Sequence, residues 1–172
     1  MRALLDSLYR LSGALAAIGM VATLVMVSAG IFSRPLGIYL SGTDDYAGYC
    51  MAACGFLALA YTFKHGEHIR VSLVLERVGP RLRKTLEWFS LAAATTIAMT
   101  LAWYAVRLAW QSHEFEEVSQ GIDATPLWIP QLSMAIGTVV LVIALLDDLI
   151  LTTLGRTPRR LAGAGNEAVR ME

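Results

Sequence analysis

Charged residues are scarce in this 172-residue chain, and long parts of it contain none. Only 16% of the residues are charged and 56% are hydrophobic, whereas roughly 25% are charged in soluble domains. Asp, Glu, Lys and Arg are absent from residues 11–33, 46–63, 88–106 and 124–146. Each stretch is close to the roughly 17 to 25 residues that a helix needs to cross hydrocarbon. We therefore expect an all-α integral membrane protein with four transmembrane helices, which satisfy their backbone polar groups internally.

Three further absences narrow the function. The net charge is zero, so no basic excess is present to neutralise nucleic-acid phosphates. Only two cysteines occur, and Cys50 and Cys54 lack the two further ligands of a zinc site, so they indicate small residues at a helix contact. The four stretches also contain no His, and intramembrane ionisable side chains normally mark a path for ions or protons. We therefore expect that this chain does not transport a solute by itself.

The positive residues predict the orientation. If both termini are cytoplasmic, twelve of the fourteen Lys and Arg residues lie on the cytoplasmic side, and only Arg34 and Arg107 lie opposite. Such an excess is typical of cytoplasmic segments. The two connections on the opposite side carry acidic residues: Asp44, Asp45, Glu114, Glu116, Glu117 and Asp123.

The connection between the second and third spans has an amphipathic pattern. On a helix, most of its Val and Leu residues share one face and most of its charged residues share the other. We expect a short helix in the plane of the cytoplasmic interface over residues 69–78. A longer helix should then begin near Pro80, form the third span and continue towards Gly121. The basic face among the lipid headgroups comprises Arg70, Arg77, Arg81, Arg83 and Lys84.

The end of the chain differs from the rest in composition. Residues 156–172 are rich in Arg, Gly and Ala. We expect a disordered cytoplasmic tail there and a single membrane domain over residues 1–155.

Two of the three histidines lie just after the second span. A metal site at His65, Glu67 and His68 would need further ligands. A b-type haem would need histidines at a suitable depth on facing helices, and His113 lies at the opposite side of the membrane. The pattern favours an interfacial corner with Gly66 as its turn residue. We expect no metal, cofactor or catalytic residue in this chain.

Two segments carry a family resemblance. They are "DDYAGYCMAACGFLALAYTFKHGEHIRVSLVLERVGPRLR" and, later, "TPLWIPQLSMAIGTVVLVIAL". Their order along four spans resembles the small, Q-type permease subunit of tripartite ATP-independent periplasmic (TRAP) transporters. The resemblance marks these candidate structural or partner-interface residues: Asp44 or Asp45, Gly55, Gly66, His68, Ile69, Val71, Leu127, Ile129, Pro130 and Gly137.

The resemblance implies a subunit of an importer in the bacterial inner membrane, and not an enzyme. A periplasmic binding protein would deliver a small organic anion, and a large M-type membrane subunit would carry it inward with sodium ions bound in that subunit. This chain would brace the large subunit within the bilayer. Two alternatives remain open from the residues: a membrane anchor subunit of a quinone-linked oxidoreductase, and a self-assembling structural membrane protein.

Overall fold

Four long helices make up the computed structural model of the chain, which describes residues 2–38, 40–65, 80–121 and 124–154. They are α1 (Arg2–Ser33), α2 (Thr43–His65), α4 (Pro80–Glu114) and α5 (Trp128–Thr153). Each is long and apolar enough to cross a membrane. The expectation of an all-helical chain with four potential spans is therefore confirmed. The expected in-plane helix over residues 69–78 and the expected tail lie outside the described residues.

The helices are longer than the uncharged stretches that predicted them. α4 begins at Pro80 as expected, because proline lacks only a donor that would be unpaired in the first turn. It ends at Glu114, earlier than the expected stop near Gly121, and Glu116 in the following turn has a φ of 50°. The additional helical turns bring charged residues into the ends of the helices.

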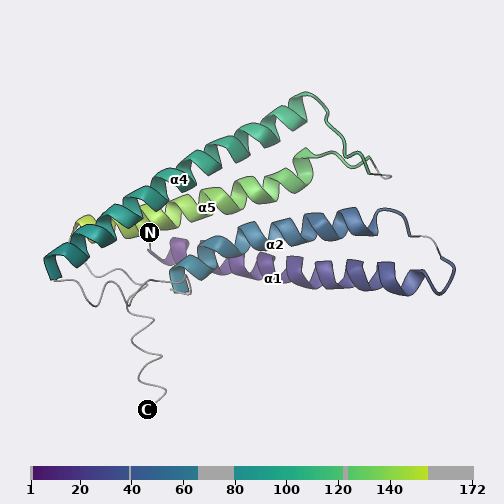
Figure 1. The fold of residues 1–172 in the computed structure, drawn as a ribbon, viewed down its shortest axis with the longest axis horizontal. Helices are drawn as coiled ribbons and strands as arrows, with labels where there is room; N and C mark the ends of the chain where they lie inside the picture. The colour runs from purple at the N-terminus through teal and green to yellow at the C-terminus, as the bar shows by residue number, and fades with distance from the viewer. Residues whose placement is uncertain (1, 39, 66–79, 122–123, 155–172) are drawn as a thin grey trace, which may run out of the picture.

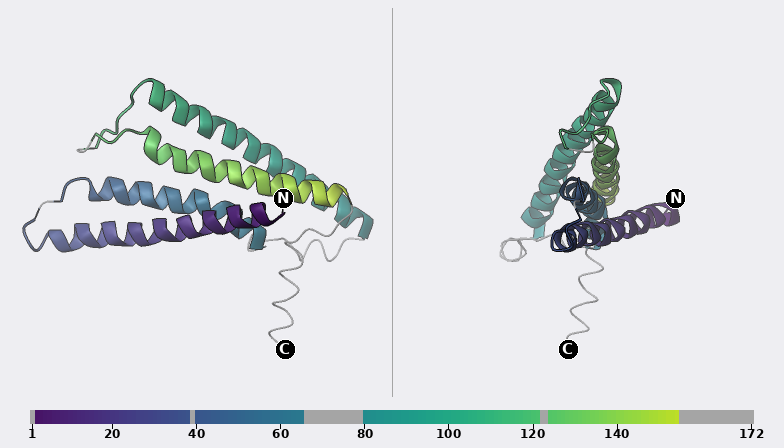
Figure 2. Two further views of the ribbon diagram at one scale, coloured as in Figure 1. Left: turned by 180° about the vertical axis from the view of Figure 1, so that it is seen from behind. Right: turned by 90° about the vertical axis from the view of Figure 1, so that its right-hand side faces the viewer.

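Two helical hairpins form the molecule (Figure 1). α1 packs against α2, α4 packs against α5, and contacts between α2 and α5 join the two hairpins. The hairpins lie close together where α2 ends and α4 begins, and they diverge towards the other end (Figures 1 and 2). We call these ends the convergent end and the open end. The connections over residues 34–42 and 115–127 lie at the open end.

The hydrophobic core lies towards the convergent end. One cluster joins three helices through Tyr9 of α1, Ala60 of α2, and Val140 and Ala144 of α5. A second cluster joins α4 to α5 through Leu91, Ala98 and Leu145. Phe63 of α2 packs against both clusters. These clusters therefore hold the four helices together from the middle of the molecule towards the convergent end.

Small residues bring α1 and α2 into close contact. A Cβ atom added to Gly13 would lie 2.6 Å from the Tyr61 ring, and one added to Gly19 would lie 3.2 Å from the backbone of Cys54. The buried Ser12 hydroxyl donates a hydrogen bond to the carbonyl oxygen of Leu57. The expectation that the cysteine pair lies at a helix contact is confirmed on α2, where both thiols are free.

Candidate interaction surfaces

The predicted site residues fall into separate parts of the molecule. Gly66, His68, Ile69, Val71, Arg70 and Arg77 lie outside the described residues, so their proposed roles stay predictions. Arg81, Arg83 and Lys84 belong to the first two turns of α4, and their side chains lie outside the description. The remaining candidates lie on α2, on α5 and at the open end.

Gly137 lies at the contact between the hairpins. A Cβ atom added to it would lie 2.5 Å from the carbonyl carbon and oxygen of Phe56 on α2. Pro130 lies in the first turn of α5, where its carbonyl oxygen accepts a hydrogen bond of 2.7 Å from the Ser133 hydroxyl. Leu127 immediately precedes this helix, and its amide donates to the carbonyl oxygen of Glu117. These positions serve contacts within the chain.

Gly55 lies on an open face of α2. Nothing lies within 4 Å of a Cβ atom added to Gly55 or to Gly48, whereas the glycines of α1 all have such neighbours. Gly48, Ala52 and Gly55 follow one another at helical spacing and are exposed, and Met51 beside them is 70% exposed. We call this surface, formed by Gly48, Ala52 and Gly55, the α2 small-residue face. At its two glycines, no other part of the described chain comes close.

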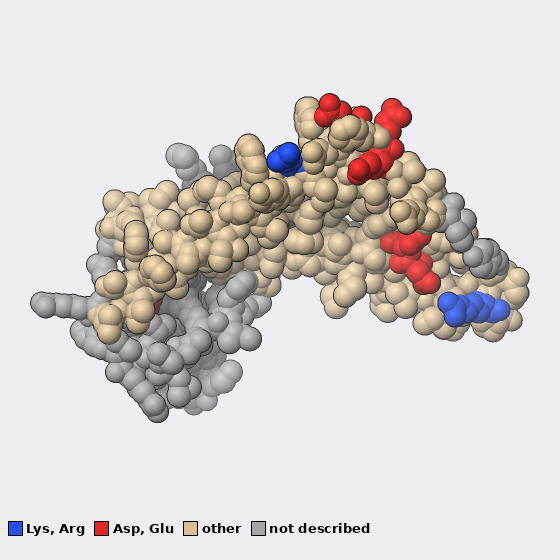
Figure 3. Space-filling model, turned by 45° about the horizontal axis from the view of Figure 1, so that its top comes forward, with Lys and Arg blue, Asp and Glu red and all other residues tan. Residues whose placement is uncertain are grey.

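Acidic residues gather at the open end, in two groups that Figure 3 shows in red. The exposed members are Asp44, Asp45, Glu114, Glu116 and Glu117. Asp45 lies in the first turn of α2, and its carboxylate reaches the other hairpin beside Gly121. The Thr125 hydroxyl donates a hydrogen bond of 3.2 Å to the Tyr46 hydroxyl. These two contacts link the hairpins where their helices have already diverged.

A cavity of about 630 Å³ lies at the open end of the first hairpin. Its lining residues include Arg34, Asp44, Asp45, Gly37 and Gly42. Both glycines have positive φ angles, 69° and 76°, which glycine adopts without strain. The sequence had placed Arg34 and the two aspartates on the same side of the membrane, and the loop brings them around one cavity.

Sequence reasoning missed a polar cluster at the convergent end. Lys64 of α2 forms an ion pair with Asp6 of α1, and the Lys64 ammonium lies 4.7 Å from the centre of the Tyr9 ring. Asp148 of α5 is also buried, with 8% of its surface exposed. The uncharged stretches that predicted the spans do not include Asp6, Lys64 and Asp148. The sequence did contain a signal for this pair. Asp6 lies near the start of α1 and Lys64 near the end of α2, and two consecutive antiparallel helices bring these ends together.

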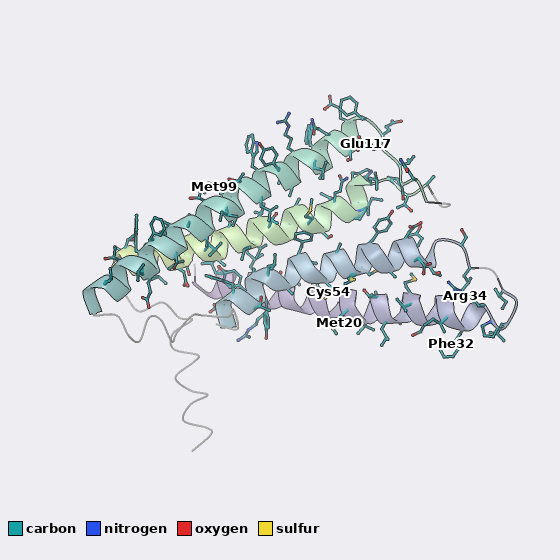
Figure 4. All side chains as sticks on the ribbon, in the orientation of Figure 1. Met20, Phe32, Arg34, Cys54, Met99 and Glu117 are labelled. Carbon is teal, nitrogen blue, oxygen red and sulfur yellow. The ribbon has the colours of Figure 1, made fainter. Side chains whose placement is uncertain are left out.

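Many large apolar side chains are exposed along the spans. Met20 and Phe32 project from the side of α1 that faces away from α2, and they are 68% and 67% exposed (Figure 4). Across residues 2–38, 40–65, 80–121 and 124–154, no three His, Cys, Asp or Glu side chains form a group that could hold a metal ion. The arrangement therefore offers surfaces for lipid or protein contact.

The family model for the DctQ component of tripartite ATP-independent periplasmic transporters matches residues 23–155, which is more than half of the chain. The family is a component of transporters and not a family of enzymes, and the match gives no support to an anchor subunit of an oxidoreductase. None of the curated proteins compared with the chain matches it. The matched region includes α2, α4, α5 and residues 23–33 of α1. The chain therefore belongs to the family of DctQ components, the small permease subunits of these transporters.

Proposed function

We propose that this chain braces the large membrane subunit of a sodium-coupled importer of small organic anions. The match to the DctQ family over residues 23–155 carries the proposal. The large M-type subunit would bind sodium and carry the anion, and a periplasmic binding protein would deliver it. The four stretches without Asp, Glu, Lys, Arg or His fit this division, since they provide no charged path for ions across the bilayer.

The exposed helix surface supports a bracing role. Only 6% of the apolar window of α1 and 17% of that of α2 are buried within the chain, against 39% for α5. The first hairpin therefore presents most of its apolar surface outward. A large membrane partner can cover such surface, and association of helices in lipid depends on close van der Waals packing.

The α2 small-residue face is the docking position that we assign to the large subunit. Small residues at Gly48, Ala52 and Gly55 permit a partner helix to approach the α2 backbone closely. The other four described helical glycines have close neighbours within the chain, at Gly13, Gly19, Gly30 and Gly137. The two open glycines thus have the geometry of a helix contact without a partner helix from the described part of the chain.

The acidic open end is the surface that we assign to the binding protein. Its exposed carboxylates at Asp44, Glu114 and Glu116 would attract a basic patch and speed the encounter, with an effect that weakens as salt rises. With the open end facing the periplasm, the convergent end faces the cytoplasm, as the distribution of Lys and Arg predicts.

Affinity purification of the full chain from native membranes tests the proposal. We expect a large polytopic membrane protein to co-purify in a fixed ratio. Gly55→Leu should reduce its yield severalfold, because the added side chain holds a partner helix away from α2. Ala94→Leu, at an exposed position on α4, is the control and should leave the yield unchanged. A flavoprotein or an iron–sulfur protein as the stoichiometric partner would contradict the proposal.

A further inference from the structure

The connection between α4 and α5 contains a short antiparallel ribbon. Val118 and Pro126 form a bridge between its two sides. Backbone hydrogen bonds of 2.8 and 2.9 Å lie on either side of this bridge. We call the described residues of the ribbon, 117–121 and 124–127, the strap.

The base of the strap is fixed to the second hairpin. The buried Ser112 hydroxyl, near the end of α4, donates a hydrogen bond of 2.6 Å to the Glu117 carboxylate. The backbone of Glu116 and that of Ala124 have positive φ angles of 50° and 43°. Residues other than glycine keep such angles only where the surrounding contacts fix the backbone. The strap is therefore a defined structural element of the second hairpin.

The far end of the strap contacts the first hairpin. The Asp45 carboxylate lies against Gly121, and a Cβ atom added to Gly121 would collide with it. The Thr125 hydroxyl donates a hydrogen bond of 3.2 Å to the Tyr46 hydroxyl. Figures 1 and 2 show the connection extending from the second hairpin towards the open end of α2. Both contacts are made with the first turn of α2.

The strap lies at the end where the hairpins diverge. The core clusters that join the hairpins lie towards the convergent end, and Gly137 meets Phe56 near the middle of α2. Packed helices can slide or pivot about such a contact by small amounts. A restraint at the open end therefore has the longest lever arm against a change in the spacing of the hairpins.

We propose that the strap fixes the separation of the two hairpins at the open end. Asp45 and Tyr46 are its anchor points on the first hairpin, and Gly121 leaves room for the Asp45 carboxylate. The exposed residues Asp44 and Glu116 belong to different hairpins, so the strap also keeps their spacing constant. This last consequence, a single rigid acidic surface for the binding protein, rests on the proposed function. The strap itself does not.

A disulfide across the contact tests the anchor point. Asp45→Cys and Gly121→Cys are combined in a chain whose Cys50 and Cys54 are replaced by Ser. A Cβ atom on Gly121 would lie 3.0 Å from the Asp45 carboxyl carbon, which is compatible with the roughly 3.5–4.5 Å between the Cβ atoms of a disulfide. We expect the bond to form in air. Failure to form it would overturn the proposal.

Distances between spin labels in the full chain, in lipid nanodiscs, test the restraint. Ketone-reactive labels on p-acetylphenylalanine at Phe32 of α1 and Trp110 of α4, which are both exposed, should give one narrow distribution. Tyr46→Phe with Gly121→Ala removes the hydrogen bond and displaces the Asp45 carboxylate. It should raise the share of molecules outside that distribution about fivefold. The disulfide-linked variant should keep the distribution narrow until it is reduced.

Gly48→Ala with Tyr49→Phe is the matched control on α2, because nothing lies within 4 Å of a Cβ atom added to Gly48. It should leave the distribution unchanged. A second label pair, at Leu11 and Phe89 near the convergent end, should not respond to any variant.

An unchanged distribution between Phe32 and Trp110 in the strap variant would overturn the proposal. Equal broadening of both label pairs would also overturn it, since the hairpins would then loosen as a whole. These measurements use this chain alone. Co-purification of the large subunit tests the proposed brace separately, so the two failures can be told apart.

Discussion

Gly137 of α5 lies directly against the backbone of Phe56 in α2. A Cβ atom at Gly137 would lie 2.5 Å from both the carbonyl carbon and the carbonyl oxygen of Phe56, and neither backbone atom can rotate away. Contacts between α2 and α5 are the main connection between the hairpins. The absence of a side chain at one position therefore allows the two hairpins to approach each other.

Gly137→Ala should destabilise the protein. The added methyl group has to push α5 away from α2, and overpacking of this kind costs about 1–3 kcal/mol. Unfolding by sodium dodecyl sulfate, followed by circular dichroism in mild detergent, measures the change. Gly55→Ala is the matched control: it meets nothing within 4 Å, and it should be neutral or slightly stabilising because alanine favours helix. Equal stability of the two variants would contradict the observed contact.

Ser12→Ala should weaken the first hairpin. The variant removes the buried hydroxyl that donates to the carbonyl oxygen of Leu57, so the free energy of unfolding should fall by about 0.5–1.5 kcal/mol. Thr100→Val is the control, because that exposed hydroxyl bonds only within α4, to the carbonyl oxygen of Thr96. The same unfolding assay compares them. If both substitutions had the same effect, the hydrogen bond between the helices would have no special role.

Asp6 and Lys64 should be energetically coupled. Their side chains are 34% and 24% exposed, so we expect a coupling near the upper part of the range of about 0.2–1 kcal/mol that is measured for exposed pairs. A double-mutant cycle with Asp6→Asn and Lys64→Gln measures the coupling. Additive effects of the two substitutions would show that the ion pair does not stabilise the hairpin. Raising the salt concentration should reduce the coupling.

The open end should face the periplasm. With Cys50 and Cys54 replaced by Ser, a single cysteine introduced by Glu116→Cys should react with a membrane-impermeant maleimide added to intact spheroplasts. A cysteine introduced by Leu154→Cys at the convergent end should react only after the membrane is permeabilised. Both positions are exposed, so burial does not limit either reaction. The reverse labelling pattern would mean that the positive residues do not set the orientation as predicted.

The spans and the family could be predicted from the residues, but the packing around individual glycines could not. Gly55 and Gly137 were both marked by the family resemblance, and they have opposite surroundings: Gly55 is open and Gly137 is tightly packed. Both occur in apolar helices, so hydropathy does not separate them. Their difference depends on which face of α2 meets α5, and no local pattern encodes that choice.

The end of α4 was also beyond local reasoning, and the ion pair at the convergent end could be expected only from the antiparallel order of the first two spans. Gly121 was expected to stop the third helix, but α4 ends at Glu114. At this end the buried Ser112 hydroxyl donates a hydrogen bond of 2.6 Å to Glu117 in the following turn. Likewise, the Asp6 and Lys64 side chains are 58 residues apart and become neighbours only through the antiparallel packing of α1 and α2.

The amino-acid sequence by itself determined that this protein has four helices able to cross a bilayer and that it belongs to a family of transporter subunits. Hydrocarbon excludes charge over a fixed thickness, so long uncharged runs can be recognised locally. Only the tertiary structure decided which surfaces are used within the chain and which stay open. The α2 small-residue face arises from how the helices cross, because packing depends on contacts between residues distant in sequence.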